Sequence, residues 1–328
     1  MVDFELRRYQ EEGKEWLKQG LRESINKYLM DEPGLGKTIQ AVKAFYEGVD
    51  EIRERSLGVD KGFTQAIFCV PNSVLYFWVE ELVRNIPERW EVLVVPVTGS
   101  KEERRKRWTV RGSGSGSGIT IYVCNYSVLR IDYEQLKTAQ WSFFLFDEAH
   151  KLSNRRTKIY KAVKDLITFS KCPVWMLSGT PVRRGAQDLW GNLSLLDREK
   201  FSSYWRFVRT WMICEDTPYG REIIGLKPDH ILNFKILIKP YSLRRKKDLL
   251  GTTKSRGQLP VMMEDEQHRI YKQLEQKMIA EYTTEVEVEK KREEEKRERF
   301  LITRNTLEKL IRLRQLVICP GFFRSQLA

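Results

Sequence analysis

The stretch Asp31-Glu32-Pro33-Gly34-Leu35-Gly36-Lys37-Thr38 predicts more about the fold of this 328-residue chain than any other. It follows an apolar segment at 28–30 and precedes apolar residues at helical spacing over 39–45. A strand, a glycine-rich turn and a helix in this order surround phosphate oxygens with backbone N–H groups. Asp31 stands where the usual pattern G-x-x-x-x-G-K-[ST] has its first glycine. We nevertheless predict a phosphate-binding loop lined by Gly34, Leu35 and Gly36.

A second run, Asp147-Glu148-Ala149-His150, ends an apolar segment. Ligands of open α/β sheets collect outside the carboxyl ends of the strands, where these carboxylates would emerge. Lys37 would place a positive charge on the outer phosphates, Thr38 and Asp147 would bind Mg²⁺, and Glu148 would activate the attacking water. The two runs together predict a nucleotide triphosphatase whose catalytic residues are Lys37, Asp147 and Glu148.

Composition narrows the class of protein. The formal net charge is +13, from 58 basic and 45 acidic residues. This excess favours a polyanion such as nucleic acid as partner, although it is also compatible with a role in solubility alone. Five scattered cysteines, three histidines and no C-x-x-C pattern argue against structural zinc and for a reduced, intracellular protein. The N-terminus lacks the apolar core of a signal peptide, and no segment has the roughly 20 apolar residues that a membrane span needs.

Apolar runs predict the fold class. They recur at 66–70, 92–97, 119–124, 143–146 and 174–177, and helical patterns such as 74–84 and 158–167 separate several of them. Apolar strands alternating with helices predict an α/β domain with a mostly parallel sheet and helices on both faces.

The domain limits follow from changes in this pattern. We predict that residues 1–255 form the α/β domain, with a helical insertion after about residue 197, and that 256–328 form a charged helical protrusion or linker. Residues 112–118 alternate strictly between Gly and Ser, which leaves them no packing capacity. This segment resembles an engineered replacement of a flexible loop more than natural sequence, so it carries no functional inference.

Several blocks then point to one family. They lie at 6–10 with Gly13 and Trp16, at 30–40, at 70–73 with Trp78 and Glu81, at 145–154, at 177–182 and at 243–248. In this order they resemble the first RecA-like lobe of Swi/Snf-type DEAH-box ATPases, which are double-stranded-DNA translocases of helicase superfamily two. The chain departs from the family at Pro33, where methionine is usual, and after Pro181, where Arg183-Arg184-Gly185 replaces a polar run.

The resemblance implies roles for particular residues. It implies ATP and Mg²⁺ as cofactors, with Gln10 reading the adenine edge. It also implies a group that couples the nucleotide site to the DNA site, namely His150, Ser178, Gly179 and Thr180. Duplex DNA would be bound largely independently of sequence by Pro71, Asn72, Ser73, Gly99, Ser100, Asn125, Tyr126, Arg183 and Arg184.

Two further groups have open interpretations. The basic run 101–111 is either a DNA contact or a solvated helix. Trp78 and Trp190 are expected to be core residues.

The resulting hypothesis is the first lobe of a DNA-dependent ATPase that translocates on duplex DNA and couples hydrolysis to remodelling of protein or DNA. A second RecA-like lobe, expected to follow residue 328, would supply arginines to the γ-phosphate, so the chain alone would act as a binding module with little turnover. Alternatives are the motor subunit of a restriction, phage-defence or repair complex, or an RNA-directed relative.

Overall fold

The computed structural model describes residues 5–55, 65–111, 118–183, 185–217 and 220–250, and the single positions 262, 265, 268 and 272. The chain divides into two units, 1–253 and 254–328. Nearly all of the described residues belong to the first unit. The predicted charged helical segment lies, apart from those single positions, outside the described residues, as do positions 112–117 of the Gly-Ser segment.

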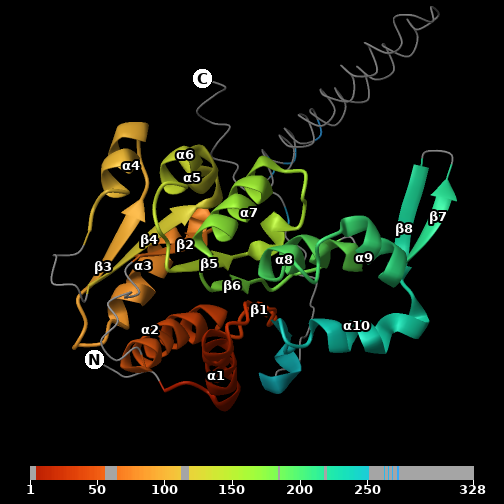
Figure 1. The fold of residues 1–328 in the computed structure, drawn as a ribbon, viewed down its shortest axis with the longest axis horizontal. Coiled ribbons are helices and arrows are strands. Elements are labelled where there is room, and N and C mark those ends of the chain that lie inside the picture. Colours follow the sequence, from red (N-terminus) through yellow and green to blue (C-terminus); the bar gives the residue numbers. More distant parts are fainter. Residues whose placement is uncertain are drawn as a thin grey trace, which may run out of the picture. The chain divides into compact units, whose positions relative to one another are not determined.

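A seven-stranded parallel sheet forms the centre of the first unit (Figure 1). Its spatial order is β3-β4-β2-β5-β6-β1-β9, and every pairing is parallel. The strands are β1 (Lys27–Leu29), β2 (Gln65–Val70), β3 (Val92–Val97), β4 (Ile119–Asn125), β5 (Phe143–Asp147), β6 (Val174–Leu177) and β9 (Ser242–Leu243). The predicted RecA-like α/β class is confirmed.

Helices cover both faces of the sheet (Figure 1). One face carries α1 (Arg8–Glu23), α2 (Lys37–Arg55) and α3 (Leu75–Arg84). The other carries α5 (Tyr126–Ile131), α6 (Tyr133–Leu136), α7 (Lys158–Ser170), α8 (Leu189–Leu196) and α9 (Tyr204–Trp211), while α10 (Ile231–Ile238) adds Phe234 to the same core. The short helix α4 (Lys101–Arg107) follows β3.

The alternation of side chains along the strands creates two cores. In β2, Ala66, Phe68 and Val70 face the α1–α3 side, while Ile67 and Cys69 face the other. Strand β5 is buried on both sides, as its continuous apolar run Phe143–Phe146 predicts. Each such large apolar side chain contributes about 1.5–3 kcal/mol when fully buried. These cores hold the carboxyl ends of the strands in fixed positions.

The segment after residue 197 differs from the prediction of helix alone. An antiparallel hairpin, β7 (Met212–Thr217) with β8 (Gly220–Leu226), follows α9. Its β-branched residues Ile213, Ile223 and Ile224 favour strands. In the described part of the chain, no helix is both long enough and apolar enough to cross a membrane.

Candidate functional site

The predicted phosphate loop connects β1 to α2 with two left-handed glycines. Gly34 has φ +88° and Gly36 has φ +73°, values that side-chain-bearing residues rarely adopt. A Cβ at Gly36 would lie 2.3 Å from Nε2 of Gln10. Glycine at this position therefore lets the backbone turn closely beneath Gln10 and presents the loop ahead of the first residues of α2.

Lys37 is the first residue of α2 and folds back over the loop. Its Nζ donates to the carbonyl of Asp31 at 2.8 Å and to that of Glu32 at 3.4 Å. Burial lowers the pKa of Lys37, while the carboxylates of Glu148, Asp147 and Asp31 oppose this effect by attracting its charge. The ammonium group is thus within electrostatic reach of both the loop and the acidic strand end.

Strand register brings the loop and the acidic strand end together. Leu29 of β1 pairs with Leu177 of β6, and Leu177 also pairs with Asp147 of β5. Two strand spacings of about 4.8 Å therefore separate the end of β1 from Asp147, a distance of about 10 Å. The predicted phosphate loop, which follows β1, and the predicted magnesium ligand therefore lie at one edge of the sheet.

Three hydrogen bonds hold Asp147. The indole N–H of Trp78 donates to Oδ2 at 2.9 Å, and the backbone N–H of Glu148 donates to Oδ1 at 2.9 Å. The hydroxyl of Tyr126 donates to the Asp147 carbonyl at 2.6 Å. Burial is the main cause of a raised pKa of Asp147. Trp78 is buried as expected, but its contact with Asp147 is a feature that sequence reasoning missed.

Glu148, His150 and Ser178 form one polar cluster. His150 Nδ1 lies 3.0 Å from Glu148 Oε2 and 3.1 Å from Ser178 Oγ, and Ser178 Oγ donates to Glu148 Oε2 at 3.2 Å. Ser178 also accepts the backbone N–H of Thr180 at 3.2 Å. Burial lowers the pKa of His150, while the Glu148 carboxylate opposes this effect. The structure therefore links the predicted base to the Ser-Gly-Thr block both directly and through His150.

Gly179 joins this block to the phosphate loop. A Cβ at Gly179 would lie 2.7 Å from Cγ of Pro33. The proline that departs from the family pattern therefore packs directly against the predicted coupling segment, and glycine permits the close approach.

Gln10 is 7% exposed and lies over the loop. Its Nε2 donates to the carbonyl of Leu35 at 3.4 Å, and its Oε1 accepts the backbone N–H of Arg7 at 2.9 Å. Its amide thus has partners within the chain, and its role in reading adenine stays a prediction.

Arg245, two positions after the end of β9, holds the start of the loop. Its Nε lies 3.0 and 3.1 Å from the two carboxylate oxygens of the fully buried Asp31, and its backbone N–H donates to Asp31 Oδ1 at 3.0 Å. Its guanidinium also donates to Gln40 Oε1 at 2.6 Å and to the carbonyl of Tyr9. The residue that replaces the first glycine of the usual pattern is therefore one half of a buried ion pair.

The side-chain oxygens at this site fit a nucleoside triphosphate with bound Mg²⁺. Mg²⁺ is commonly held by one or two protein oxygens together with substrate phosphates and water. Thr38 and Asp147 offer a hydroxyl and a carboxylate of this kind. The described residues contain no group of three or more His, Cys, Asp or Glu that could form an all-protein metal cage.

The predicted DNA contacts gather at the same edge of the sheet. Asn125 ends β4 in register with Val70 of β2, and Cys124 is in register with Val97 of β3. The segments 71–73, 98–100 and 125–126 therefore follow three neighbouring strand ends. Asn125 donates to the side chain of Asn72 at 3.0 Å, which joins two of them directly.

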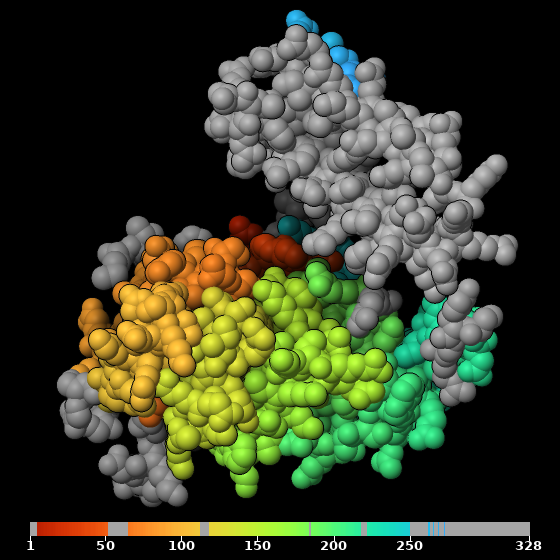
Figure 2. All heavy atoms as spheres, turned by 90° about the horizontal axis from the view of Figure 1, so that it is seen from above, coloured from red at the N-terminus to blue at the C-terminus, as the bar shows by residue number. Residues whose placement is uncertain are grey.

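Within the basic run, the structure separates internal contacts from exposed charges. Arg104 makes a bidentate pair with Asp132, at 2.8 and 2.9 Å, and Arg107 donates to Thr98 Oγ1 at 2.6 Å. Lys101, Arg105 and Lys106 are exposed. The surface of this segment lies beside that of residues 118–140 in the space-filling view (Figure 2).

The arginines after Pro181 are only partly described. Arg183 is exposed, and its backbone N–H donates to Asp188 at 3.2 Å. Arg184 lies outside the described residues.

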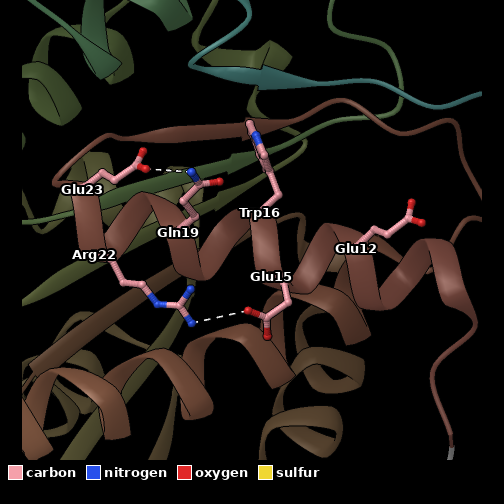
Figure 3. A pocket seen from close by; sticks show the side chains of 6 residues that line it. All are labelled: Glu12, Glu15, Trp16, Gln19, Arg22 and Glu23. Carbon is pink, nitrogen blue, oxygen red and sulfur yellow. Dashed lines mark hydrogen bonds and ion pairs between the residues drawn. The ribbon is translucent and has the colours of Figure 1, made fainter.

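A surface hollow on α1 is separate from the predicted site. It is lined by Glu12, Glu15, Trp16, Gln19, Arg22 and Glu23 (Figure 3). Arg22 contacts Glu15 at 3.4 Å and Gln19 donates to Glu23 at 2.7 Å. This hollow contains none of the residues predicted to bind nucleotide or DNA.

The fold and the loop define the class of protein as a P-loop α/β domain with an acidic pair at the end of β5, two strands away from β1. The family described as "SNF2-related domain" matches residues 9–321, and the chain belongs to it.

Individual relatives agree with this family. The chain is 27% identical over 254 residues to the "Chromatin-remodeling ATPase INO80" of Aspergillus oryzae, which covers 75% of this chain and 16% of that protein. It is 26% identical over 286 residues to the protein of the same name from Cryptococcus neoformans, covering 85% of this chain and 15% of that protein. The chain therefore spans only a small part of the length of these relatives.

Solved structures share the fold. The structure described as "Sulfolobus solfataricus SWI2/SNF2 ATPase core in complex with dsDNA" matches with a TM-score of 0.58 and 24% identity, covering 98% of this chain and 60% of that chain. At this identity the likeness concerns the fold alone.

Proposed function

We propose that this chain is the ATP-binding lobe of a DNA-dependent ATPase that translocates on double-stranded DNA and remodels protein–DNA assemblies. The observation that carries the proposal is the register Leu29–Leu177–Asp147, which brings the phosphate loop and the acidic strand end to one edge of the sheet. The curated relatives named above are chromatin-remodelling ATPases, and the archaeal fold neighbour was solved with double-stranded DNA.

Each residue of the nucleotide site has a task in this proposal. The backbone N–H groups of Gly34, Leu35 and Gly36 bind phosphate oxygens, and Lys37 leaves its loop carbonyls to neutralise their charge. Thr38 and Asp147 hold Mg²⁺, which when bound offsets negative charge on the β- and γ-phosphates.

Glu148 accepts the proton of the attacking water. Its contacts with His150 and Ser178 connect the base to the segment that precedes Arg183. If DNA contact moved that segment, the position of the Glu148 carboxylate would change. The rate of hydrolysis would then depend on DNA.

DNA binding is proposed at the ends of β2, β3 and β4. The side chains of Ser100 and Asn125 already cap α4 and α5, accepting the N–H groups of Glu103 and Val128. Contact with DNA there would use neighbouring backbone groups and the exposed cations Lys101, Arg105 and Lys106. Contacts of this kind bind phosphates without reading bases. A second RecA-like lobe as partner stays part of the proposal.

The test is an ATPase assay on the whole protein, with and without duplex DNA of random sequence. We expect stimulation by duplex DNA and the loss of nucleotide binding in Lys37→Ala. Glu148→Gln should retain ATP binding and lose hydrolysis, since the amide cannot accept the proton. Full activity of Glu148→Gln would contradict the assignment of the base, and hydrolysis indifferent to DNA would contradict the coupling.

A further inference from the structure

The Trp78 side chain makes a contact that its role in the core does not require. It is fully buried in α3 and packs edge-on against Phe68, with ring centroids 5.8 Å apart. Its indole is a hydrogen-bond donor only, and it donates to Oδ2 of Asp147, a residue 69 positions further along the chain. A charged acceptor makes this a stronger bond than one between neutral groups.

The two donors at Asp147 act on different oxygens. Oδ2 accepts the indole N–H, and Oδ1 accepts the backbone N–H of Glu148. Because each carboxylate oxygen accepts more than one bond, both oxygens keep capacity for a further ligand. One donor on each oxygen fixes the plane of the carboxylate, and the bond from Tyr126 fixes the carbonyl of the same residue.

We propose that Trp78 is a positioning residue that orients the Asp147 carboxylate toward Mg²⁺. This inference rests on the proposed Mg–ATP site. Groups that hydrogen-bond to a metal ligand set its orientation, and their removal typically weakens metal affinity by about 10- to 100-fold. Trp78 does not touch the nucleotide or the metal in this proposal and acts only through Asp147.

The chain contains a matched control. Trp175 in β6 is also fully buried, belongs to the same core and packs edge-on against a phenylalanine, Phe143, at 4.9 Å. Its indole Nε1 is buried without a hydrogen-bond partner within the described residues. Trp78→Phe and Trp175→Phe therefore remove similar apolar volume from one core, but only the first removes a donor from Asp147.

The experiment measures ATP affinity of the 328-residue chain in Mg²⁺ and in EDTA, for the wild type and both variants. The readout is the dissociation constant in EDTA divided by the dissociation constant in Mg²⁺, together with the melting temperature. We expect the ratio to fall about tenfold or more in Trp78→Phe and to stay at the wild-type value in Trp175→Phe. Affinity in EDTA should be the same in all three proteins, since the phosphate loop is unchanged.

A Trp78→Phe ratio equal to that of the wild type would overturn the inference. So would an equal loss of affinity with and without Mg²⁺, because the indole would then act on the fold and not on the metal site. A wild-type chain that binds no ATP, or binds it equally in Mg²⁺ and EDTA, would instead remove the proposed Mg–ATP site itself.

A second measurement tests the role of Trp78 if the Trp78→Phe variant does not fold. In the wild-type chain, the NMR resonance of the Trp78 indole N–H should shift when Mg²⁺ is added to the ATP complex, while that of Trp175 should not. An unchanged Trp78 resonance in a complex that binds Mg²⁺ would refute its contact with the metal ligand.

Discussion

Replacing Arg245 by methionine should destabilise the domain severely. Asp31 is fully buried and the Arg245 side chain is 11% exposed. Methionine fills much of the same volume but leaves the Asp31 carboxylate with the backbone N–H of residue 245 as its remaining hydrogen-bond donor among the described residues. Removing one partner of a buried ion pair costs about 3–5 kcal/mol, because the other charge stays buried and uncompensated. For a unit of this size the melting temperature should fall by roughly 10 °C.

The assay is urea unfolding of four proteins followed by circular dichroism. These are the wild type, Arg245→Met, the double variant Asp31→Asn/Arg245→Met, and Arg8→Met. The double variant should recover more than half of the loss, since no unpaired charge remains. Arg8 pairs with Glu12 on the surface, where its side chain is 95% exposed, so Arg8→Met should change the free energy of unfolding little. If Arg245→Met lost no more unfolding free energy than Arg8→Met, the stabilising role of the buried Arg245–Asp31 ion pair would be refuted.

Three further predictions concern the loop, the histidine and the basic helix. Gly36→Ala should abolish ATP binding in a calorimetric titration, because its left-handed φ strains any residue with a side chain and the added Cβ would displace the Gln10 amide. Burial lowers the pKa of His150, so the unfolded state binds more protons than the folded state below about pH 6.5. The free energy of unfolding should therefore fall as the pH is lowered through this range. His150→Gln should make this fall smaller in thermal melts recorded from about pH 8 to about pH 5. Lys106→Ser should reduce the salt dependence of DNA binding without altering the melting temperature. Arg104→Met should instead lower that temperature, because Arg104, unlike the exposed Lys106, is paired with Asp132.

Some features of the site follow from local sequence. The phosphate loop and the acidic strand end are each a short apolar strand followed by a turn with special residues. Each signal is complete within about ten positions. For the same reason the strands at 66–70, 92–97 and 174–177 were predicted nearly to the residue. In contrast, the hairpin β7–β8 was missed because the nearby aromatics at helical spacing dominated the pattern.

The sequence alone therefore determined that the chain has a P-loop α/β domain of the Swi/Snf type, and it predicted Lys37 and Asp147 as residues of the proposed nucleotide site. Only the tertiary structure decided how those residues are held. Trp78 reaches Asp147 across 69 positions of the chain and Arg245 reaches Asp31 across 214. No local pattern encodes such contacts, because they arise when strand order and register bring distant segments to one edge of the sheet.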